Sequence, residues 1–547
     1  MSVPAKPTYR QSFTTTTLLL LLSLVTAPLS FTITTIIWLV HSRKVKPVKS
    51  ISTSKDSSSG STSTTARPIT VLITGARTTK SLVVARIFWK AGYRVILGDE
   101  REWGLLAASR FSRCISKYYN LPDPTQDHAL YKMTIWRIIK QNDVKLWIPA
   151  SSAGATMHDA MVADDLKKLP EFEKVQFFIQ SPQEAAQLHD KDLFTQLCEN
   201  LGFKVPEGIL VSSIDQAVEF LHDDARQGRK YIVKCTALDD QGRSDLTQLP
   251  FESPAKTRAH LRRMPRPISE QSPYVLQQFI DGYEFCTHCH AVEGVMQSFL
   301  CCPSSDMLMR YMDCKTNFSQ SIAEDAEQWT REFLERWKTA LKKEEEKRMN
   351  NRPAPIDGED EEEQPRTISL SGHFSFDFIV DSEGTLYPIE CNPRIHTAVV
   401  LLATANSQQM ALSYLGKKEN GILHADEIAK ERYSWIFHAL PIALACKIIP
   451  RKYWKSIHPL LESSLDIDPL KTSVPAITIS PPVRSELSEI IMSYVNGSEK
   501  DPMLDLDDPF PFAFQHLTWT WLLARLVYYH ARGWSRLNVS TSRIFTC

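Results

Sequence analysis

Apolar and uncharged positions dominate the beginning of the chain. Residues 11–40 contain no charged side chain, and residues 18–40 are mostly Leu, Ile, Val, Thr and Phe. A helix of this length can span a bilayer. A secretory signal peptide is the alternative, but the run exceeds a typical signal core and no clear small-residue cleavage site follows. Basic residues are denser after the run than before it, so we expect a single span at residues 18–40, with the domain that follows facing the cytosol.

Short apolar strands and amphipathic helices alternate further along. After a tail at residues 1–17, the span and a flexible Ser- and Thr-rich linker at residues 41–68, a strand, a turn, a helix and a second strand follow by residue 98. This order is typical of a βαβ unit. Apolar runs at residues 146–149 and 175–179 add further strands. We therefore expect an open parallel α/β domain at residues 69–182.

The turn after the first strand, Gly-Ala-Arg-Thr-Thr-Lys-Ser at residues 75–81, resembles a phosphate-binding loop at first sight. It lacks the second glycine and is one residue short of the motif, so its amides would not wrap a phosphate. We interpret it as a plain strand-to-helix turn.

Composition narrows the class of protein. With 547 residues the chain is long enough for several domains, and its 63 basic and 63 acidic residues balance to a formal charge of zero. This balance gives no indication of a nucleic-acid partner. Eleven scattered cysteines argue against a disulfide framework and for a reducing compartment.

A β-hairpin is predicted late in the chain. Residues 373–380 alternate apolar with small or polar side chains, Asp-Ser-Glu-Gly follows as a turn, and residues 385–389 are apolar again. Asp377 and Glu390 then lie on neighbouring strands, and Asn392 adds an amide oxygen. These are the hard ligands that Mg²⁺ takes. Arg394 adds a fixed positive charge, although an ordinary exposed hairpin has the same pattern.

Two lysines and a hinge precede the hairpin. Lys191 opens an amphipathic helix and Lys234 lies near the end of a strand. Residues 274–284 are a strand that runs into a turn and ends at Glu284. Such a hinge can offer backbone groups to an adenine ring and a carboxylate to ribose hydroxyls.

In this order the residues resemble the ATP-grasp superfamily, in which two α+β subdomains hold ATP between two antiparallel sheets behind a parallel α/β domain. The resemblance covers residues 69 to about 410. It implies an ATP-grasp domain at residues 183–410 and leaves a mostly helical C-terminal extension at residues 411–547. It also implies ATP with Mg²⁺ or Mn²⁺ as cofactors. The implied roles are phosphate contacts for Lys191 and Lys234, adenine contacts for Gln277, Gln278, Phe279 and Ile280, a ribose contact for Glu284, metal ligation by Asp377, Glu390 and Asn392, and charge stabilisation by the catalytic Arg394.

Several local runs are closer to one branch. The segments at residues 234–250, 284–288, 302–306, 390–396 and 533–538 are similar to those of mycosporine-glycine synthases. Members of that branch join an amino acid's amine to a vinylogous acid, and they tend to carry an apolar N-terminal segment. The resemblance implies a carbon–nitrogen ligase of natural-product biosynthesis with small-molecule acid and amino acid substrates. It sets no oligomeric state.

Two departures from the superfamily stand out. Residues 235–250 hold only Gly242 where many members have a glycine-rich phosphate lid, so Arg243 is the expected phosphate contact there. A charged insertion at residues 342–366 precedes the hairpin; we interpret it as a solvated loop, with an acidic docking tail as the alternative.

Residues 286–290, Cys-Thr-His-Cys-His, match a haem-attachment pattern. On a strand, Cys286 and Cys289 would point to opposite faces, which makes attachment difficult. A zinc site with Cys301 and Cys302 fits no standard spacing. We expect His288 and His290, with His396 beyond the hairpin, to be candidates for substrate contact, and a strand with satisfied histidines is the equal alternative.

Two further features have no assigned role. Three glycosylation sequons matter only if the topology is inverted. Residues 510–529 are apolar but interrupted by His516 and Arg525, which favours an internal or membrane-surface helix over a second span.

The predicted chemistry has two steps. ATP phosphorylates a carboxylate or an enolised 1,3-dicarbonyl oxygen, and a neutral amine then displaces phosphate. A carboxylase, biotin-dependent or not, shares the same core and the E-x-N-x-R spacing, but no biotinyl-lysine domain is evident in the sequence. A nucleotide-binding membrane scaffold without turnover is the alternative from another class.

Overall fold

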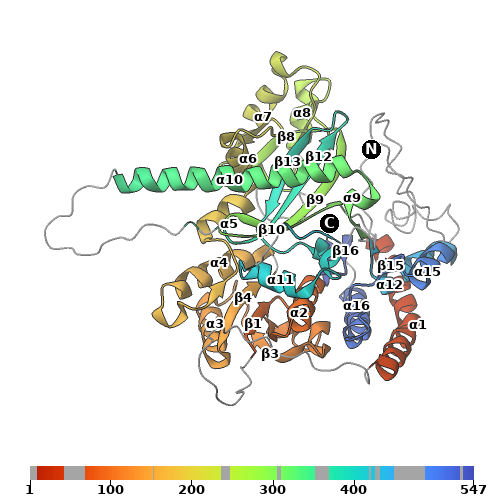
Figure 1. Ribbon diagram of the computed structural model, residues 1–547. Coiled ribbons are helices and arrows are strands. Elements are labelled where there is room, and N and C mark those ends of the chain that lie inside the picture. The colour runs from red at the N-terminus through yellow and green to blue at the C-terminus, as the bar shows by residue number, and fades with distance from the viewer. Residues whose placement is uncertain are drawn as a thin grey trace.

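The computed structural model has three sheets that matter for the site and a mostly helical C-terminal part (Figure 1). It describes residues 9–41, 68–151, 153–235, 247–304, 310–350, 368, 370–417, 421–425, 432–448, 487–529 and 534–546. The expected linker, the lid with Gly242 and Arg243, and most of the charged insertion lie outside these residues. The expected fold class, mixed α/β with an apolar N-terminal helix, is confirmed.

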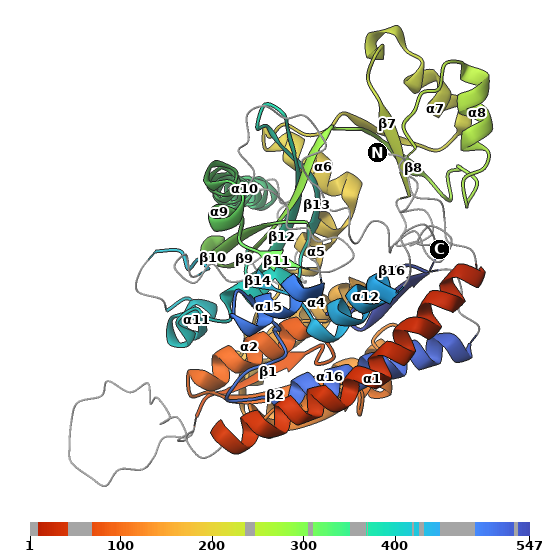
Figure 2. The same ribbon diagram turned by 90° about the vertical axis from the view of Figure 1, so that its right-hand side faces the viewer.

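The first element is a long helix, α1 (Tyr9–His41). It begins well before the apolar run. Hydroxyl side chains fit this first part of the helix because each can donate to the carbonyl four residues earlier, as Thr16 does to Ser12. In Figure 2, α1 lies along the body of the protein beside α16 (Phe510–Tyr528). Among the described residues it is the one helix long and apolar enough to cross a membrane.

The packing of α1 is inverted relative to a helix of a soluble core. Apart from Leu19, its buried positions are small and polar and follow a helical spacing, and they are Ser12, Thr15, Thr16, Ser23, Ser30 and Thr34. Most of its exposed positions are apolar: Val25 is 76% exposed, and Leu21, Leu24 and Leu29 are exposed beside it. His516 of α16 contacts the hydroxyls of Ser30 and Thr26, and the hydroxyls of Ser23 and Thr520 are 2.7 Å apart.

The parallel sheet has the strand order β3-β2-β1-β4-β5. Its strands are β1 (Thr70–Thr74), β2 (Arg94–Glu100), β3 (Ile115–Leu121), β4 (Val144–Pro149) and β5 (Gln176–Phe177). The helices α2 (Thr79–Lys90), α3 (His128–Asn142) and α4 (Ala153–Lys167) connect them. The open parallel sheet is therefore as expected. Strand β3 was not predicted, because its largely exposed positions at the sheet edge carry little apolar signal.

The turn after β1 begins at Gly75, whose φ of +82° favours glycine. A side chain there would also collide with the carbonyl oxygen of Ala150. Thr78 then caps α2 by accepting from the amide of Ser81. This is the strand-to-helix turn that the sequence predicts.

Two antiparallel sheets follow. The smaller contains β6 (Gly208–Val211), β8 (Tyr274–Gln278) and β7 (Tyr231–Cys235), with α7 (Ile214–Leu221) and α8 (Pro254–Leu261) beside it (Figure 2). The larger has the order β10-β9-β12-β13, with bounds Val295–Pro303, Gly282–Val292, Gly372–Asp381 and Leu386–Asn392. Helices α5 (Pro182–His189) and α6 (Lys191–Asn200) link the parallel sheet to these lobes.

Helix α10 (Gln320–Asn350) runs across the larger sheet in Figure 1. Phe333 and Trp337 of this helix belong to the same buried cluster as Phe374 and Phe376 of β12. The alternating pattern of β12 supplies that apolar face, and the opposite face carries Asp377. The helix thus fixes the strand that holds the candidate metal ligand.

The C-terminal part packs on the parallel sheet. It contains η5 (Thr397–Leu402), α11 (Ser407–Tyr414), β14 (Arg432–Tyr433), α12 (Ile436–Ile448), α15 (Leu487–Val495), β15 (Glu499–Lys500), α16, β16 (Trp534–Asn538) and β17 (Arg543–Thr546). Trp435, Phe512 and Trp519 share one buried cluster with Phe88 of α2. Residues 510–528 form the expected helix, with most of one side internal.

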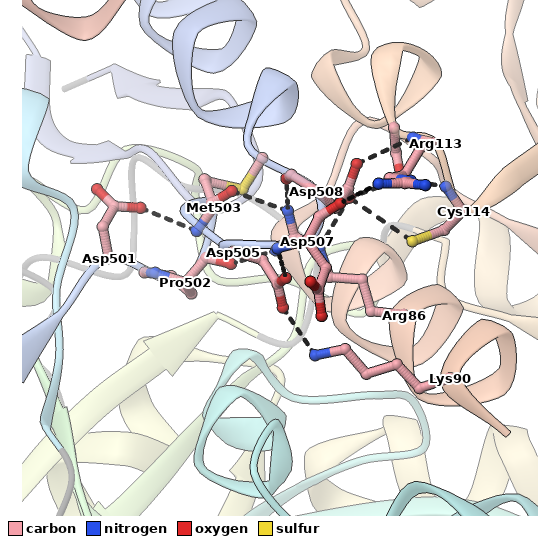
Figure 3. Close-up of polar contacts among 11 residues, drawn as sticks. Arg86, Lys90, Arg113, Cys114, Asp501, Pro502, Met503, Asp505, Asp507 and Asp508 are labelled. Carbon is pink, nitrogen blue, oxygen red and sulfur yellow. Dashed lines mark hydrogen bonds and ion pairs between the residues drawn. The ribbon is translucent and has the colours of Figure 1, made fainter. Parts of the chain in front are cut away.

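A buried ion pair fastens this C-terminal part to α2 (Figure 3). Arg86 donates to a carboxylate oxygen of Asp508 at 2.9 Å and to the carbonyl oxygens of Pro502, Met503 and Asp508. Asp508 also accepts from the hydroxyl of Ser112 at 2.7 Å. Every nitrogen of the guanidinium group therefore donates to at least one acceptor, as such burial requires.

Candidate functional site

The predicted carboxylates meet on the larger antiparallel sheet. Asp377 of β12 is directly opposite Glu390 of β13 in the register, as the hairpin predicts. The amide nitrogen of Asn392 donates to Glu390 Oε1 at 3.1 Å and to Asp377 Oδ2 at 3.4 Å. The guanidinium of Arg394 donates to Asn392 Oδ1 at 2.5 Å. The four residues therefore form one continuous polar group.

The two carboxylates perturb each other strongly. Burial and the negative charge of Glu390 raise the pKa of Asp377 well above its usual range. Burial would raise the pKa of Glu390 too, but the ammonium of Lys191, 2.6 Å away, together with Asp377 and Asn392, holds it below its ordinary value. Two adjacent acids that share limited positive charge form a good site for a cation.

The donor set suits a hard divalent cation. Asp377 and Glu390 supply carboxylate oxygens, and Asn392 supplies an amide oxygen if its amide group rotates, since its nitrogen faces the acids as drawn. The described residues contain no group of three His, Cys, Asp or Glu side chains that could hold a metal by themselves. A metal here would therefore complete its shell with water or phosphate oxygens. The cysteines and histidines at residues 286–302 form no such group either, so the zinc alternative has no support in the described residues.

Both predicted lysines join this group. Lys191 is the first residue of α6, after the N-cap Asp190, and contacts Glu390. Lys234 of β7 donates to the side-chain oxygen of Gln277. Burial and then the charge of Lys191 lower the pKa of Lys234 to about 8, while Glu390, Glu284 and Asp377 oppose that shift. The smaller sheet, α6 and the larger sheet thus bring their charges together.

The expected adenine hinge connects the two sheets. Gln277 and Gln278 end β8, and the backbone amides of Gln278 and Phe279 donate to the carbonyls of Glu207 and Lys230 at 2.7 Å each. Ile280 is buried just beyond them. These two amides are engaged within the sheet, so an adenine ring would meet the remaining backbone groups of the hinge.

Glu284 lies on β9 beside the hinge, opposite Ile379 of β12. Solvent reaches its side chain, yet enough protein surrounds it that desolvation raises its pKa. The charges of Lys234 and Glu390 also influence it. The predicted ribose contact therefore lies close to the lysines and the carboxylates.

The three predicted histidines have different surroundings. His290 is fully buried, with Ser413 and Ser298 at its two ring nitrogens and Tyr414 stacked on its face. This is the satisfied core histidine of the alternative interpretation. His288 is also buried, with Nδ1 3.2 Å from the hydroxyl of Ser375. His396 caps η5 through its ring and is half-buried.

The cysteines of the same strand behave as the alternation predicts. Cys286 packs in the core shared with the parallel sheet, and Cys289 packs in the core beneath α10, so they point to opposite faces. Cys286, Cys289, Cys301 and Cys302 are all free, buried thiols. A single haem could not bond both residues of this pair.

Sequence reasoning missed a second polar group behind Arg394. A small pocket, with a cavity volume of about 10 Å³, lies between the parallel sheet and the hairpin. Its polar lining consists of Ser151, Thr156, Asp159, Gln180, His373 and Arg394. Apart from Arg394, no local motif signals these residues, since they come from distant segments.

Lys80 is the other missed residue. It lies in the turn-like run 75–81, is buried, and donates to the carbonyls of Ile395 at 2.9 Å and Ser151 at 3.3 Å. Burial and then the charge of Arg394 lower its pKa to about 7. It therefore joins the first helix of the parallel domain to the loop that follows Arg394.

Comparisons with known proteins show limited similarity. No family model matches the chain, and no curated protein matches it either. Among solved structures, an L-amino acid ligase from Bacillus licheniformis aligns with a TM-score of 0.41 and 13% identity over 64% of this chain and 75% of its own. N5-carboxyaminoimidazole synthetase from Staphylococcus aureus, complexed with ADP, aligns with a TM-score of 0.41 and 16% identity over 64% and 78%.

A third similar structure is the biotin carboxylase domain of 2-oxoglutarate carboxylase from Hydrogenobacter thermophilus, in complex with MgADP, ADP and bicarbonate. It aligns with a TM-score of 0.41 and 11% identity over 65% of this chain and 72% of its own. At these TM-scores and identities the likeness carries no conclusion about activity. Any conclusion about activity therefore rests on the residues of the site.

Proposed function

We propose that this protein is an ATP-dependent ligase that joins an acid to the amine of an amino acid through a carbon–nitrogen bond. One observation carries the proposal: Lys191 pairs with the carboxylate of Glu390 opposite Asp377, and Lys234 lies close enough for the charges of both acids to affect its pKa, although the four residues come from four separate elements. A solvated hairpin would not need two lysines from elsewhere. The arrangement suits a polyphosphate bound through a cation.

The residues would divide the work by charge. Asp377, Glu390 and Asn392 would hold Mg²⁺ or Mn²⁺, which supplies positive charge to the phosphates when bound. Lys191 and Lys234 would contact phosphate oxygens, with Arg243 in the lid. The hinge at residues 277–280 would hold the adenine, and Glu284 would accept from the ribose hydroxyls.

Arg394 would stabilise the group that is transferred. It is adjacent to the metal ligands through Asn392 and also lines the neighbouring pocket. An oxygen of the acid attacks the γ-phosphorus, ADP leaves with the bridging oxygen, and the acid becomes an acyl or vinylogous phosphate. An amine then displaces phosphate. Fixed positive charges favour both steps because negative charge builds up on the transferred oxygens.

The finer substrate assignment rests on the resemblance in the sequence. Similarity to mycosporine-glycine synthases favours a vinylogous acid as the phosphorylated substrate and a role in natural-product biosynthesis. A carboxylase is the second candidate, because it would use the same ATP site with bicarbonate. Dependence of ADP release on both an acid and an amine favours the ligase, whereas dependence on bicarbonate favours the carboxylase.

We also propose that α1 holds the protein at a membrane, with the site on the cytosolic side. The support is the apolar outer face of the helix and its lack of charge between residues 11 and 40. A helix that buries hydroxyls and exposes Leu, Ile and Val is suited to lipid rather than water.

Substitution of one metal ligand tests the ligase proposal. Glu390→Gln removes a negative charge that the cation needs, so we expect ADP release to fall by about a hundredfold or more. ADP is measured for the full chain in detergent with Mg-ATP, a panel of carboxylic acids and cyclic 1,3-diketones, and the twenty amino acids. Glu383→Gln, in the exposed turn of the same hairpin, is the matched control and should retain wild-type activity.

Two results would contradict the proposal. Wild-type turnover by the Glu390→Gln protein would show that this carboxylate holds no metal. Absence of ADP release by the wild-type protein with every pair of substrates would favour the non-catalytic scaffold. Circular dichroism of both variants separates loss of chemistry from loss of fold.

A further inference from the structure

The pocket behind Arg394 contains buried polar atoms that nothing in the protein satisfies. Asp159, Gln180 and His373 line it and are 0%, 1% and 2% exposed. Within the described part of the chain, Asp159 Oδ2, Gln180 Oε1 and both ring nitrogens of His373 have no hydrogen-bond partner at normal geometry, although the Ser151 hydroxyl lies close enough to influence the Asp159 carboxylate. Buried polar atoms of native proteins are nearly always paired, so these four atoms in one pocket offer hydrogen bonds to a small polar group.

The orphan atoms specify the chemistry of that ligand. A carboxylate oxygen and an amide oxygen only accept, and they therefore require N–H or O–H donors. The other atoms of these side chains are already engaged: Tyr131 donates to Asp159 Oδ1 at 2.5 Å, and Gln180 Nε2 donates to the carbonyl of His373 at 2.6 Å. Each side chain is thus fixed with its unpaired acceptor left over. A protonated amine offers three donors and a charge opposite to that of a carboxylate.

The position of the pocket also fits an amine. Arg394 is a lining residue and at the same time contacts Asn392 of the candidate metal site. Lys80 fastens the two walls, because it donates to Ser151 of the parallel domain and to Ile395 beyond Arg394. A ligand in this pocket would lie beside the Arg394 side chain, which also contacts the candidate metal ligand Asn392.

We propose that this pocket binds the amino group of the amino acid substrate, and that Asp159 accepts its proton. The inference rests on the proposed ligase function, since it names the place of the second substrate. Gln180 Oε1 takes a second N–H of the amine. Asp159 is the residue that makes the nucleophile.

The step balances with the groups named. The ammonium transfers one proton to Asp159 Oδ2, and the nitrogen lone pair attacks the carbon that bears the phosphate ester oxygen. The carbon–oxygen bond to phosphate breaks, and phosphate leaves with the electron pair. The nitrogen loses its second proton to the departing phosphate, which gives the amide or enamine. The phosphorylated acid comes from the ATP-dependent step of the proposed function.

Electrostatics supports a base at this position. Burial raises the pKa of Asp159 to about 7, while the hydroxyls of Tyr131 and Ser151 oppose the shift and the charges of Glu100 and Asp99 add to it. The cations nearby are Lys80 and Arg394. The ring of His373 faces the same pocket as a neutral group, because burial lowers its pKa. A carboxylate with this pKa exchanges protons near neutral pH, as a general base should.

Direct binding tests the inference without knowledge of the acid. The full chain in detergent is titrated by calorimetry with each of the twenty amino acids at pH 8. We expect at least one to bind saturably and its analogue without the amino group, such as propionate for alanine, not to bind. Asp159→Asn should lower the affinity for that amino acid at least tenfold. Asp164→Asn, on the exposed side of the same helix, should leave the affinity unchanged. Mg-ATP binding equal to wild type shows that each variant is folded.

Dependence on pH adds a readout that a structural role would not change. Affinity for the amino acid should rise between pH 6 and pH 8 as Asp159 loses its proton, and this rise should be absent in Asp159→Asn. Lys80 titrates over the same pH range. The Lys80→Met variant should therefore still show the rise in affinity that is due to Asp159. If Asp159→Asn does not fold, Gln180→Met serves as the second variant, with affinity expected to fall severalfold.

Failure of this inference differs from failure of the ligase proposal. Absence of amino acid binding, or equal binding by Asp159→Asn, overturns the inference even if ADP release proceeds normally. Amino acid binding that depends on Asp159 supports the inference even if no acid elicits ADP release, an outcome that would overturn only the ligase proposal.

Discussion

Arg86 is a charged side chain with almost no access to solvent, and its surroundings compensate for the lost hydration. It is 6% exposed, and its partner Asp508 is 1% exposed. Three backbone carbonyls and one carboxylate oxygen take its donors. The side chain joins α2 to the segment between β15 and α16, as Figure 3 shows.

Removal of this cation should be costly. Arg86→Met would leave Asp508 buried with the hydroxyl of Ser112, the amide of Arg113 and the thiol of Cys114 as its remaining donors. An uncompensated buried charge typically costs about 3–5 kcal/mol. We therefore expect the free energy of unfolding, measured by urea denaturation, to fall by that amount.

Lys90 offers a matched control on the same helix. It pairs with Asp505 at 2.8 Å, but its side chain is one-third exposed. Lys90→Met should lower the free energy of unfolding by less than about 1 kcal/mol, because water can hydrate Asp505 once the lysine is removed. Equal decreases in the free energy of unfolding for the two variants would mean that burial does not make the Arg86 pair more important for stability than the exposed Lys90 pair.

At the scale of elements, α1 and α16 form a pair joined by polar groups. His516 contacts Ser30, Thr26 and Ser23 of α1, and Thr520 contacts Ser23. Small hydroxyl residues allow two helices to approach closely and to form hydrogen bonds across the contact. The hydropathy of the sequence predicted the helix, but not that its polar side would face inward.

Cross-linking tests this pairing. Ser23→Cys with Thr520→Cys places two thiols where hydroxyls are 2.7 Å apart, so mild oxidation of membranes should join the two helices. Mass spectrometry of the linked peptides measures the yield. Leu24→Cys with Thr520→Cys is the control, because Leu24 points outward and should give little cross-link. Similar yields from both pairs would exclude a fixed arrangement of α1 on α16.

At the scale of the whole molecule, the C-terminal part is built into the first domain rather than appended to it. One buried cluster includes Val71 of β1, Phe88 of α2, Val399 of η5 and Trp519 of α16. Thr79 also donates through its amide to the carbonyl of Ser540. The helix that carries Lys80 is thus held in place by residues far along the chain.

Truncation should therefore unfold the first domain as well. A protein that ends at residue 410 lacks Tyr414, Trp435, Phe512 and Trp519, all buried in the shared core. Each buried aromatic side chain contributes about 1.5–3 kcal/mol, and the total rivals the stability of an ordinary domain. Residues 69–410 should show no cooperative thermal transition by circular dichroism, whereas residues 69–547 should. A cooperative transition of the shorter protein at a similar temperature would contradict the shared core.

Much of the candidate site was readable from local sequence. Asp377 and Glu390 are separated by a turn with strong strand patterns on both sides, so their pairing follows from the hairpin alone. Lys191 follows from a helix start and Lys234 from a strand. The order of these elements made a nucleotide site the natural prediction.

The sequence by itself determined the apolar helix, the βαβ pattern and the hairpin, because period and turn chemistry act over a few residues. Only the tertiary structure decided that Asp159, Gln180 and His373 line one pocket and that α1 buries its hydroxyls. The pocket joins α4, the segment after β5 and β12, and nothing in their local patterns relates them. Contacts at such separation depend on how sheets and helices pack, and local spacing does not record that packing.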